Sequence, residues 1–299
     1  MKKRVLKKSV KRFIYISLIS IILLIIGISL IKYYTGNLYK LTKLGYSKLE
    51  AKEIISLNKS SIVLEKEYNE KMIDIIKAKY YLEKNIDKYI TYYNEHKDRS
   101  IDDIIAIVNV HADNEFYSLD LKSDTTFNNM LVNKYYYLGE YEPENLVAVK
   151  NWYAYGNQKL DKDTYEAFIN MFNDAKKENL TIIINQGYRS YSTQEETYKK
   201  YDDNYAARAG YSEHQTGLAI DVISPNSDGD NFDASLEYTW LINNSYKYGF
   251  ILRYPKGKKD ITGYAYESWH FRYLGIDLAT KVYESGLTYD EYYAYYIDK

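Results

Sequence analysis

The chain has 299 residues, 46% of them hydrophobic and 27% charged, which suits one sizeable globular domain plus a smaller part and excludes wholesale disorder. Lysine and arginine (40) nearly balance aspartate and glutamate (41), but seven of the basic residues lie within residues 1–12, which hold no acid. The remainder is acidic, so we predict no nucleic-acid partner. No cysteine is present, which excludes disulfides, thiol nucleophiles and cysteine-ligated metals.

Residues 13–31 read FIYISLISIILLIIGISLI and contain no charge. As a helix they would span about 28 Å at about 1.5 Å per residue, close to the hydrocarbon thickness of a bilayer. The segment is longer than the apolar core of a signal peptide, and no Ala-x-Ala cleavage pattern follows it. We predict one transmembrane helix, with the basic tail 1–12 in the cytoplasm and the rest of the chain extracellular.

Residues 32–128 are predicted to form a helical membrane-proximal region. The motifs that begin at Ser47 and Ser100 are typical of helix starts, and apolar residues at 101, 104, 105 and 108 mark one helix face. His96 and His111 lack metal-ligand spacing. The region is either a spacer or a binding site for a partner in the envelope, and we infer no particular protein partner.

From residue 129 onward, prolines and most of the glycines interrupt the pattern, which indicates helices alternating with strands and turns. Residues 129–299 are predicted to form an α+β domain with a small antiparallel sheet flanked by helices. The predicted strands are 180–185, 218–223 and 250–254. The predicted helices are 163–179, one capped by Ser192 with Glu195, 235–248, and a short C-terminal one that opens at Thr288.

Two of the four histidines lie near acidic residues in the sequence, and taken together they could form a metal site. His214 precedes a predicted strand that contains Asp221, and His270 follows Glu267 by three residues. Two imidazoles and one carboxylate form a three-ligand zinc site that leaves a fourth position open for water. Glu267 is the candidate base that takes a proton from that water. Since positions three apart face opposite sides of a regular strand, we expect a turn or bulge between Glu267 and His270.

Three segments carry a resemblance to a known family: GYRSYSTQ (187–194), ARAGYSEHQTGLAIDV (207–222) and YGFILRYPKGKKDITGYAYESWHFRYLG (248–275). Together they resemble the VanY-type D-alanyl-D-alanine carboxypeptidases. That family belongs to a group of zinc peptidases that also includes D-Ala-D-Ala dipeptidases and hedgehog-like domains. The resemblance covers residues 129–286 and implies the corresponding fold.

The resemblance implies zinc (Zn2+) as the cofactor and assigns a role to each motif residue. His214, Asp221 and His270 would be ligands and Glu267 the base. Arg189 would stabilise the carbonyl oxygen or bind the substrate carboxylate. Gln194 and Ser212 would hold the terminal D-amino acid. Arg208 is a further candidate for substrate binding or a surface cation.

Nearby charged residues are given structural roles. We expect Arg253 and Arg272 to pair with acids or to stack on tyrosine rings. The side chain of Glu213 is expected to point away from the metal.

The sequence therefore predicts a membrane-anchored zinc carboxypeptidase that removes the C-terminal D-Ala from peptidoglycan stem peptides. The alternatives are an L,D-carboxypeptidase that acts on tetrapeptide stems and a peptidoglycan endopeptidase. A non-catalytic wall-binding module is a further alternative, but such a module would have lost a ligand or the base, and all four residues are present. The motifs do not separate D,D from L,D specificity.

Overall fold

The computed structural model describes residues 8–126, 128–201, 206–225 and 229–298, so residues 1–7 of the predicted basic tail lie outside it. The chain divides into two compact units, Met1–Lys97 and Asp98–Lys299. The catalytic domain predicted from the sequence spans residues 129–299. The compact unit that contains those residues also includes residues 98–128, which hold helix α7 (Ile101–Asn109) and strand β1 (Leu121–Lys122).

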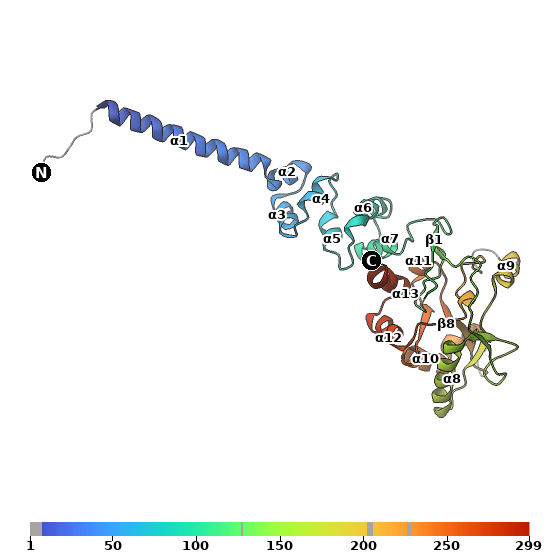
Figure 1. Ribbon diagram of the computed structural model, residues 1–299. Helices are drawn as coiled ribbons and strands as arrows, with labels where there is room; N and C mark the ends of the chain where they lie inside the picture. Colours follow the sequence, from blue (N-terminus) through green and yellow to red (C-terminus); the bar gives the residue numbers. More distant parts are fainter. Residues whose placement is uncertain (1–7, 127, 202–205, 226–228, 299) are drawn as a thin grey trace. The chain divides into compact units, whose positions relative to one another are not determined.

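Helix α1 (Lys8–Thr35) contains the apolar segment near the N-terminus (Figure 1). Its stretch Arg12–Tyr33 has a mean hydropathy of 2.9 and is not buried against other parts of the chain. By length and composition this stretch is able to cross a bilayer, and it is the one such helix in the described part of the chain. The helix is thus compatible with a membrane anchor.

The rest of the first unit consists of short helices around a small apolar core. These are α2 (Asn37–Leu44), α3 (Lys48–Ser56), α4 (Ser60–Leu64), α5 (Met72–Lys77), η1 (Glu83–Asn85) and α6 (Ile86–Glu95). Ser47 and Glu50 form the predicted capping box at the start of α3. Leu41, Ile54 and Met72 are fully buried in the core, so this unit has a hydrophobic centre of its own.

The second unit is built on a four-stranded antiparallel sheet, as far as the described residues show, with the strand order β5-β6-β8-β7. The strands are β5 (Ile183–Gln186), β6 (Ala219–Ile223), β7 (Phe250–Tyr254) and β8 (Glu267–Tyr273). Short strands β1 and β2 (Tyr136–Tyr137) pair in parallel, and β3 (Leu146–Ala148) and β4 (Lys159–Asp161) pair antiparallel. The predicted α+β class with a small antiparallel sheet is confirmed.

The alternation of side chains along β6 and β8 gives the sheet two different faces. Ile220 lies opposite Phe271, and both are fully buried in the main core. Asp221 lies opposite His270 and therefore points to the other face. Strand pairing alone thus brings two of the three predicted ligands together.

Helices cover both faces of this sheet. Helix α8 (Lys162–Lys177) packs Phe168 and Met171 into the main core, and α10 (Leu236–Asn244) adds Leu241 to it. On the other face, α12 (Ile276–Ser285) packs against β7, and α13 (Tyr289–Tyr292) contributes Tyr289 to a second core (Figure 1).

The start of one predicted helix differs from the structure. Helix α9 (Tyr191–Lys200) is capped by Ser190, whose Oγ accepts a hydrogen bond from the backbone N–H of Thr193. The predicted cap, Ser192, lies inside the helix. Both serines are good N-cap residues, but only Ser190 has the extended backbone that a cap requires.

Candidate metal centre and active site

The three predicted ligands lie together on the face of the sheet opposite α8. His214 comes from the 3-10 turn η2 (Glu213–Thr216) that leads into β6, Asp221 from the middle of β6, and His270 from β8. Their ligand atoms lie within 4.8 Å of one another. His214 Nε2 is 3.3 Å and His270 Nδ1 is 2.9 Å from the two oxygens of Asp221. In the described part of the chain this is the one group of acids and histidines spaced to hold a metal.

The opposite nitrogen of each imidazole has an acceptor of its own. Nδ1 of His214 lies 2.8 Å from the carbonyl oxygen of Gly187, and Nε2 of His270 lies 3.2 Å from Oε2 of Glu213. Such partners fix the ring orientation and leave the remaining nitrogen with a lone pair for a metal. The centre therefore receives Nε2 from His214 and Nδ1 from His270.

This donor set fits zinc. Two neutral imidazole nitrogens and one carboxylate are typical of catalytic zinc sites. Bonds of about 2.0–2.1 Å in a tetrahedron place neighbouring ligand atoms about 3.3 Å apart, comparable to the spacing described above. The ligands open into a cavity of about 210 Å³, which offers space for a further ligand and a substrate.

Glu267 lies beside this centre, with Oε2 3.9 Å from His270 Nδ1. The expected bulge is present, because the pairing of β7 with β8 shifts register between Leu252 and Tyr254, so β8 has two extra residues there. Burial raises the pKa of Glu267 to about 7, although His270 acts in the opposite direction. A carboxyl group that titrates near neutral pH is suited to accept and return a proton.

The predicted substrate-binding residues Arg189, Gln194 and Ser212 all line the same cavity. Nη1 of Arg189 donates to Oε1 of Gln194 at 2.8 Å, and Nε2 of Gln194 donates to the carbonyl of Ala207 at 2.6 Å. The fixed amide therefore holds the guanidinium in place. Burial lowers the pKa of Arg189, which nevertheless stays charged at any physiological pH.

Arg208 is placed differently. It is exposed, its guanidinium carbon lies 4.2 Å from the ring centroid of Tyr117, and it is not among the described residues that line the cavity. Its contact with a substrate stays a prediction.

Glu213 contacts the ligand His270, a role that the sequence did not indicate. Its side chain is fully buried, and its Oε1 accepts hydrogen bonds from Arg253 and Arg272, both at 2.8 Å, while Oε2 faces His270. Burial alone would raise the pKa of Glu213, but the two guanidinium groups hold it well below its usual range. The expected pairing of Arg253 and Arg272 with acids is confirmed. No sequence signal indicated that both would meet the residue next to a ligand.

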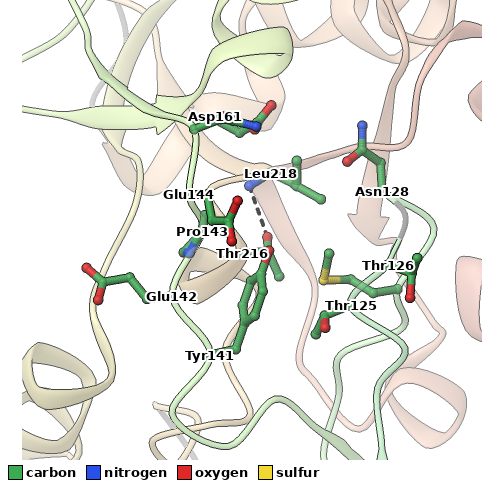
Figure 2. A pocket seen from close by; sticks show the side chains of 12 residues that line it. Thr125, Thr126, Asn128, Tyr141, Glu142, Pro143, Glu144, Asp161, Thr216 and Leu218 are labelled. Carbon is green, nitrogen blue, oxygen red and sulfur yellow. Dashed lines mark hydrogen bonds between the residues drawn. The ribbon is translucent and has the colours of Figure 1, made fainter.

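A separate and larger cavity, of about 510 Å³, shares no lining residue with the metal cavity. Figure 2 shows residues 141–144 on one side and Thr125, Thr126 and Asn128 across from them. Its polar groups stabilise local structure: Asp161 caps α8, and the Thr216 hydroxyl accepts from the backbone N–H of Leu218, the dashed line in Figure 2. The candidate chemistry therefore belongs to the smaller cavity.

Comparison with known proteins agrees with this geometry. The profile of the family described as "VanY: D-alanyl-D-alanine carboxypeptidase" matches residues 157–276. A D-alanyl-D-alanine carboxypeptidase of Enterococcus faecium is 39% identical over 140 residues, which cover 46% of this chain and 45% of that protein. The bifunctional D-Ala-D-Ala dipeptidase and carboxypeptidase VanXYC of Enterococcus gallinarum is 37% identical over 127 residues, 38% of this chain and 67% of that protein.

The solved structure of the LD-carboxypeptidase LdcB superposes with a TM-score of 0.52 at 37% identity, over 55% of this chain and 85% of LdcB. The chain spans between 45% and 67% of the length of the curated relatives it matches. The matched part of the chain contains the metal-site residues described above.

Proposed function

Because the chain belongs to the VanY family of D-alanyl-D-alanine carboxypeptidases, we propose that it is a zinc carboxypeptidase that removes the C-terminal D-Ala from peptidoglycan stem peptides. The observation that carries the proposal is the cavity in which His214, Asp221 and His270 converge beside Glu267, with Arg189 on its wall. A site that combines metal ligands, a base and a fixed cation supplies what hydrolysis next to a free carboxylate needs.

Zinc held by these three residues would supply a Lewis acid and lower the pKa of water in the cavity. Glu267 would take the proton from that water and return it to the departing amine. Arg189, held by Gln194, would bind the terminal carboxylate or the developing oxyanion, and Ser212 would hold the terminal residue. Glu213 would keep the His270 ring in its productive orientation.

We further propose that α1 anchors the enzyme in the cell membrane as a single pass, with the N-terminus in the cytoplasm and the second unit outside. The basic residues that precede the apolar segment support this orientation. An external position would give the active site access to the cell wall.

A second candidate is L,D-carboxypeptidase activity on tetrapeptide stems. The observation that favours it is the likeness to LdcB, a protein described as an LD-carboxypeptidase. The same metal centre would serve both reactions, since they differ in the configuration of the residue before the scissile bond.

The test uses the full chain, purified in detergent with zinc and incubated separately with a synthetic stem pentapeptide and a tetrapeptide. Mass spectrometry should show loss of one alanine from the pentapeptide, or from the tetrapeptide if the second candidate holds. Glu267→Ala should bind zinc but cleave neither peptide, because no base remains. Glu284→Ala, which removes an exposed acid on α12, should match the wild type. A zinc-loaded wild type that shortens neither peptide would refute both activities.

A further inference from the structure

A second cavity adjoins the metal cavity on the side of Glu267. It has a volume of about 350 Å³ and shares the residues Tyr264, Glu267 and Trp269 with the metal cavity. Arg189 lines the metal cavity but not this one. If the C-terminal residue of a peptide lies near Arg189, the chain on the other side of the scissile bond therefore leads past Glu267 into the second cavity.

Lys134 lines this second cavity and is an unusual residue to find there. It is only 4% exposed, although lysine is seldom buried. Its Nζ lies 4.1 Å from the ring centroid of Phe116 and 4.9 Å from that of Tyr264. Two aromatic faces stabilise the ammonium by cation–π attraction, which offsets part of the free energy lost with its hydration.

The neighbouring backbone fixes the position of Lys134. Its carbonyl accepts the backbone N–H of Tyr117 at 2.8 Å, and the Asn133 side chain binds the following turn and Asp290. Gly263, which has a φ of +77°, leaves room for the lysine stem, because a Cβ at that position would lie 3.3 Å from Lys134 Cδ. The fold thus presents this cation at the cavity wall in one arrangement.

The charges around the cavity favour an anionic ligand. Lys259 also lines it, and apart from Glu267 the described lining carries no acid. A round cavity of this volume is about 9 Å across, which corresponds to two or three residues of extended chain at about 3.3 Å each. A group bound by Lys134 would therefore belong to the second or third residue before the scissile bond.

We propose that Lys134 determines substrate specificity by binding a free carboxylate on the acyl side of the scissile bond. This inference rests on the proposed carboxypeptidase function and adds a substrate preference to it. Lys134 takes no part in the chemical step, so it should act on substrate binding and leave turnover nearly unchanged.

The experiment uses zinc-loaded full-length enzyme and two pairs of peptides with the susceptible C-terminus. The two members of each pair differ only in that one carries a carboxylate and the other a carboxamide. In the first pair this group is on the second residue before the scissile bond, and in the second pair it is on the third. The wild type should prefer the carboxylate in one pair by about tenfold in kcat/KM, mostly through KM, as expected for one charge-assisted hydrogen bond. Lys134→Met should lose this preference while keeping its activity on the carboxamide peptide.

Lys150→Met is the matched control, because Lys150 is an exposed lysine whose Nζ lies 5.1 Å from the Trp152 ring and outside both cavities. It should retain the preference. Lys134→Gln provides a second neutral variant if the methionine variant does not fold. Equal kcat/KM for both members of each pair in the wild type, or a preference that survives in a folded neutral variant, would overturn the inference. Cleavage of any peptide upholds the carboxypeptidase function independently, whereas cleavage of none would refute that function instead.

Discussion

His214 and His270 present different ring nitrogens to the candidate centre. The hydrogen bond from His214 Nδ1 to the Gly187 carbonyl leaves Nε2 for the metal, whereas the contact of His270 Nε2 with Glu213 leaves Nδ1. The rings lie almost perpendicular, at 88°, with centroids 5.0 Å apart. This difference cannot be read from the sequence, since both residues are simply histidines there, and it leads to a substitution test.

The side-chain amide of asparagine lies approximately where Nδ1 of a histidine would lie. The side-chain amide of glutamine lies approximately where Nε2 would lie. We therefore expect His270→Asn to bind zinc at least about tenfold more tightly than His270→Gln, a difference of about 1.4 kcal/mol. The order should reverse at position 214, with His214→Gln the tighter binder. Competition with a chromophoric chelator measures these affinities. The same order at both positions would show that the two histidines use the same nitrogen.

The buried Glu213 supports both the metal ligand and the protein core. In Glu213→Gln one carboxylate charge disappears while Arg253 and Arg272 remain buried. Breaking a buried ion pair in this way costs about 3–5 kcal/mol, so the melting temperature should fall by roughly 10 °C. Zinc affinity should fall about 10- to 100-fold, because His270 loses its negatively charged acceptor.

Calorimetry and chelator competition measure these two effects of Glu213→Gln. Glu166→Gln is the control, because Glu166 is exposed and its Oε1 lies 3.9 Å from Nζ of Lys162. Loss of this exposed charge should change the free energy of unfolding by no more than about 0.5 kcal/mol. Unchanged melting of Glu213→Gln would mean that the network does not stabilise the fold.

Strand β8 shows how an element places groups that sequence spacing alone would separate. A regular strand would put Glu267 and His270 on opposite faces, and the shifted register against β7 brings the carboxylate to 3.9 Å from the imidazole. The need for a bulge followed from the spacing and the chemistry together. Leu252 and Tyr254 are the residues of β7 between which the register shifts. They could not be predicted, because they depend on pairing between distant segments.

Helix α8 was predicted because its apolar residues recur with a period near 3.6 over four turns. Strands β1 to β4 were not predicted, because two or three residues are too few to show alternation. The start of α9 was misplaced by two residues because two serines on either side of Tyr191 compete for the cap. Length alone does not decide which elements are predicted, because helix α12, with ten residues, was not predicted either.

The cap of α8 offers a test at the scale of an element. Asp161 accepts hydrogen bonds from the backbone N–H groups of Asp163 and Thr164. Asp161→Ala should lower the free energy of unfolding by about 1 kcal/mol, whereas Asp161→Asn should keep most of it, since asparagine is an equally good cap. Urea unfolding measures both. Zinc affinity should stay unchanged, because α8 packs on the sheet face opposite the ligands. Equal losses in the two variants would show that charge, and not capping, matters at this position.

At the scale of the whole molecule, the sequence predicted the apolar helix, the helical region after it and the α+β domain, each from a local pattern. The four central site residues were proposed from their residue types together with the family resemblance, and the structure brings them close to one another. Two features escaped prediction. Residues 98–128 belong to the second compact unit through contacts such as Arg272 with the Asn128 carbonyl. Lys134 faces a cavity only because Phe116 and Tyr264 converge on it. Both features depend on contacts between residues far apart in the chain.

The proposed membrane topology can be tested directly because the chain contains no cysteine. The variants Lys8→Cys and Lys48→Cys each introduce one cysteine at an exposed position. The two positions lie on opposite sides of the apolar stretch, so each variant places one reactive thiol on one side of it. A membrane-impermeant maleimide should label the position 48 variant on intact cells and the position 8 variant only after permeabilisation, because the basic residues keep the N-terminus inside. The cysteine-free parent shows the background. The reverse pattern would invert the topology and place the active site in the cytoplasm, away from its proposed substrate. Labelling of both positions on intact cells would mean that α1 does not cross the membrane.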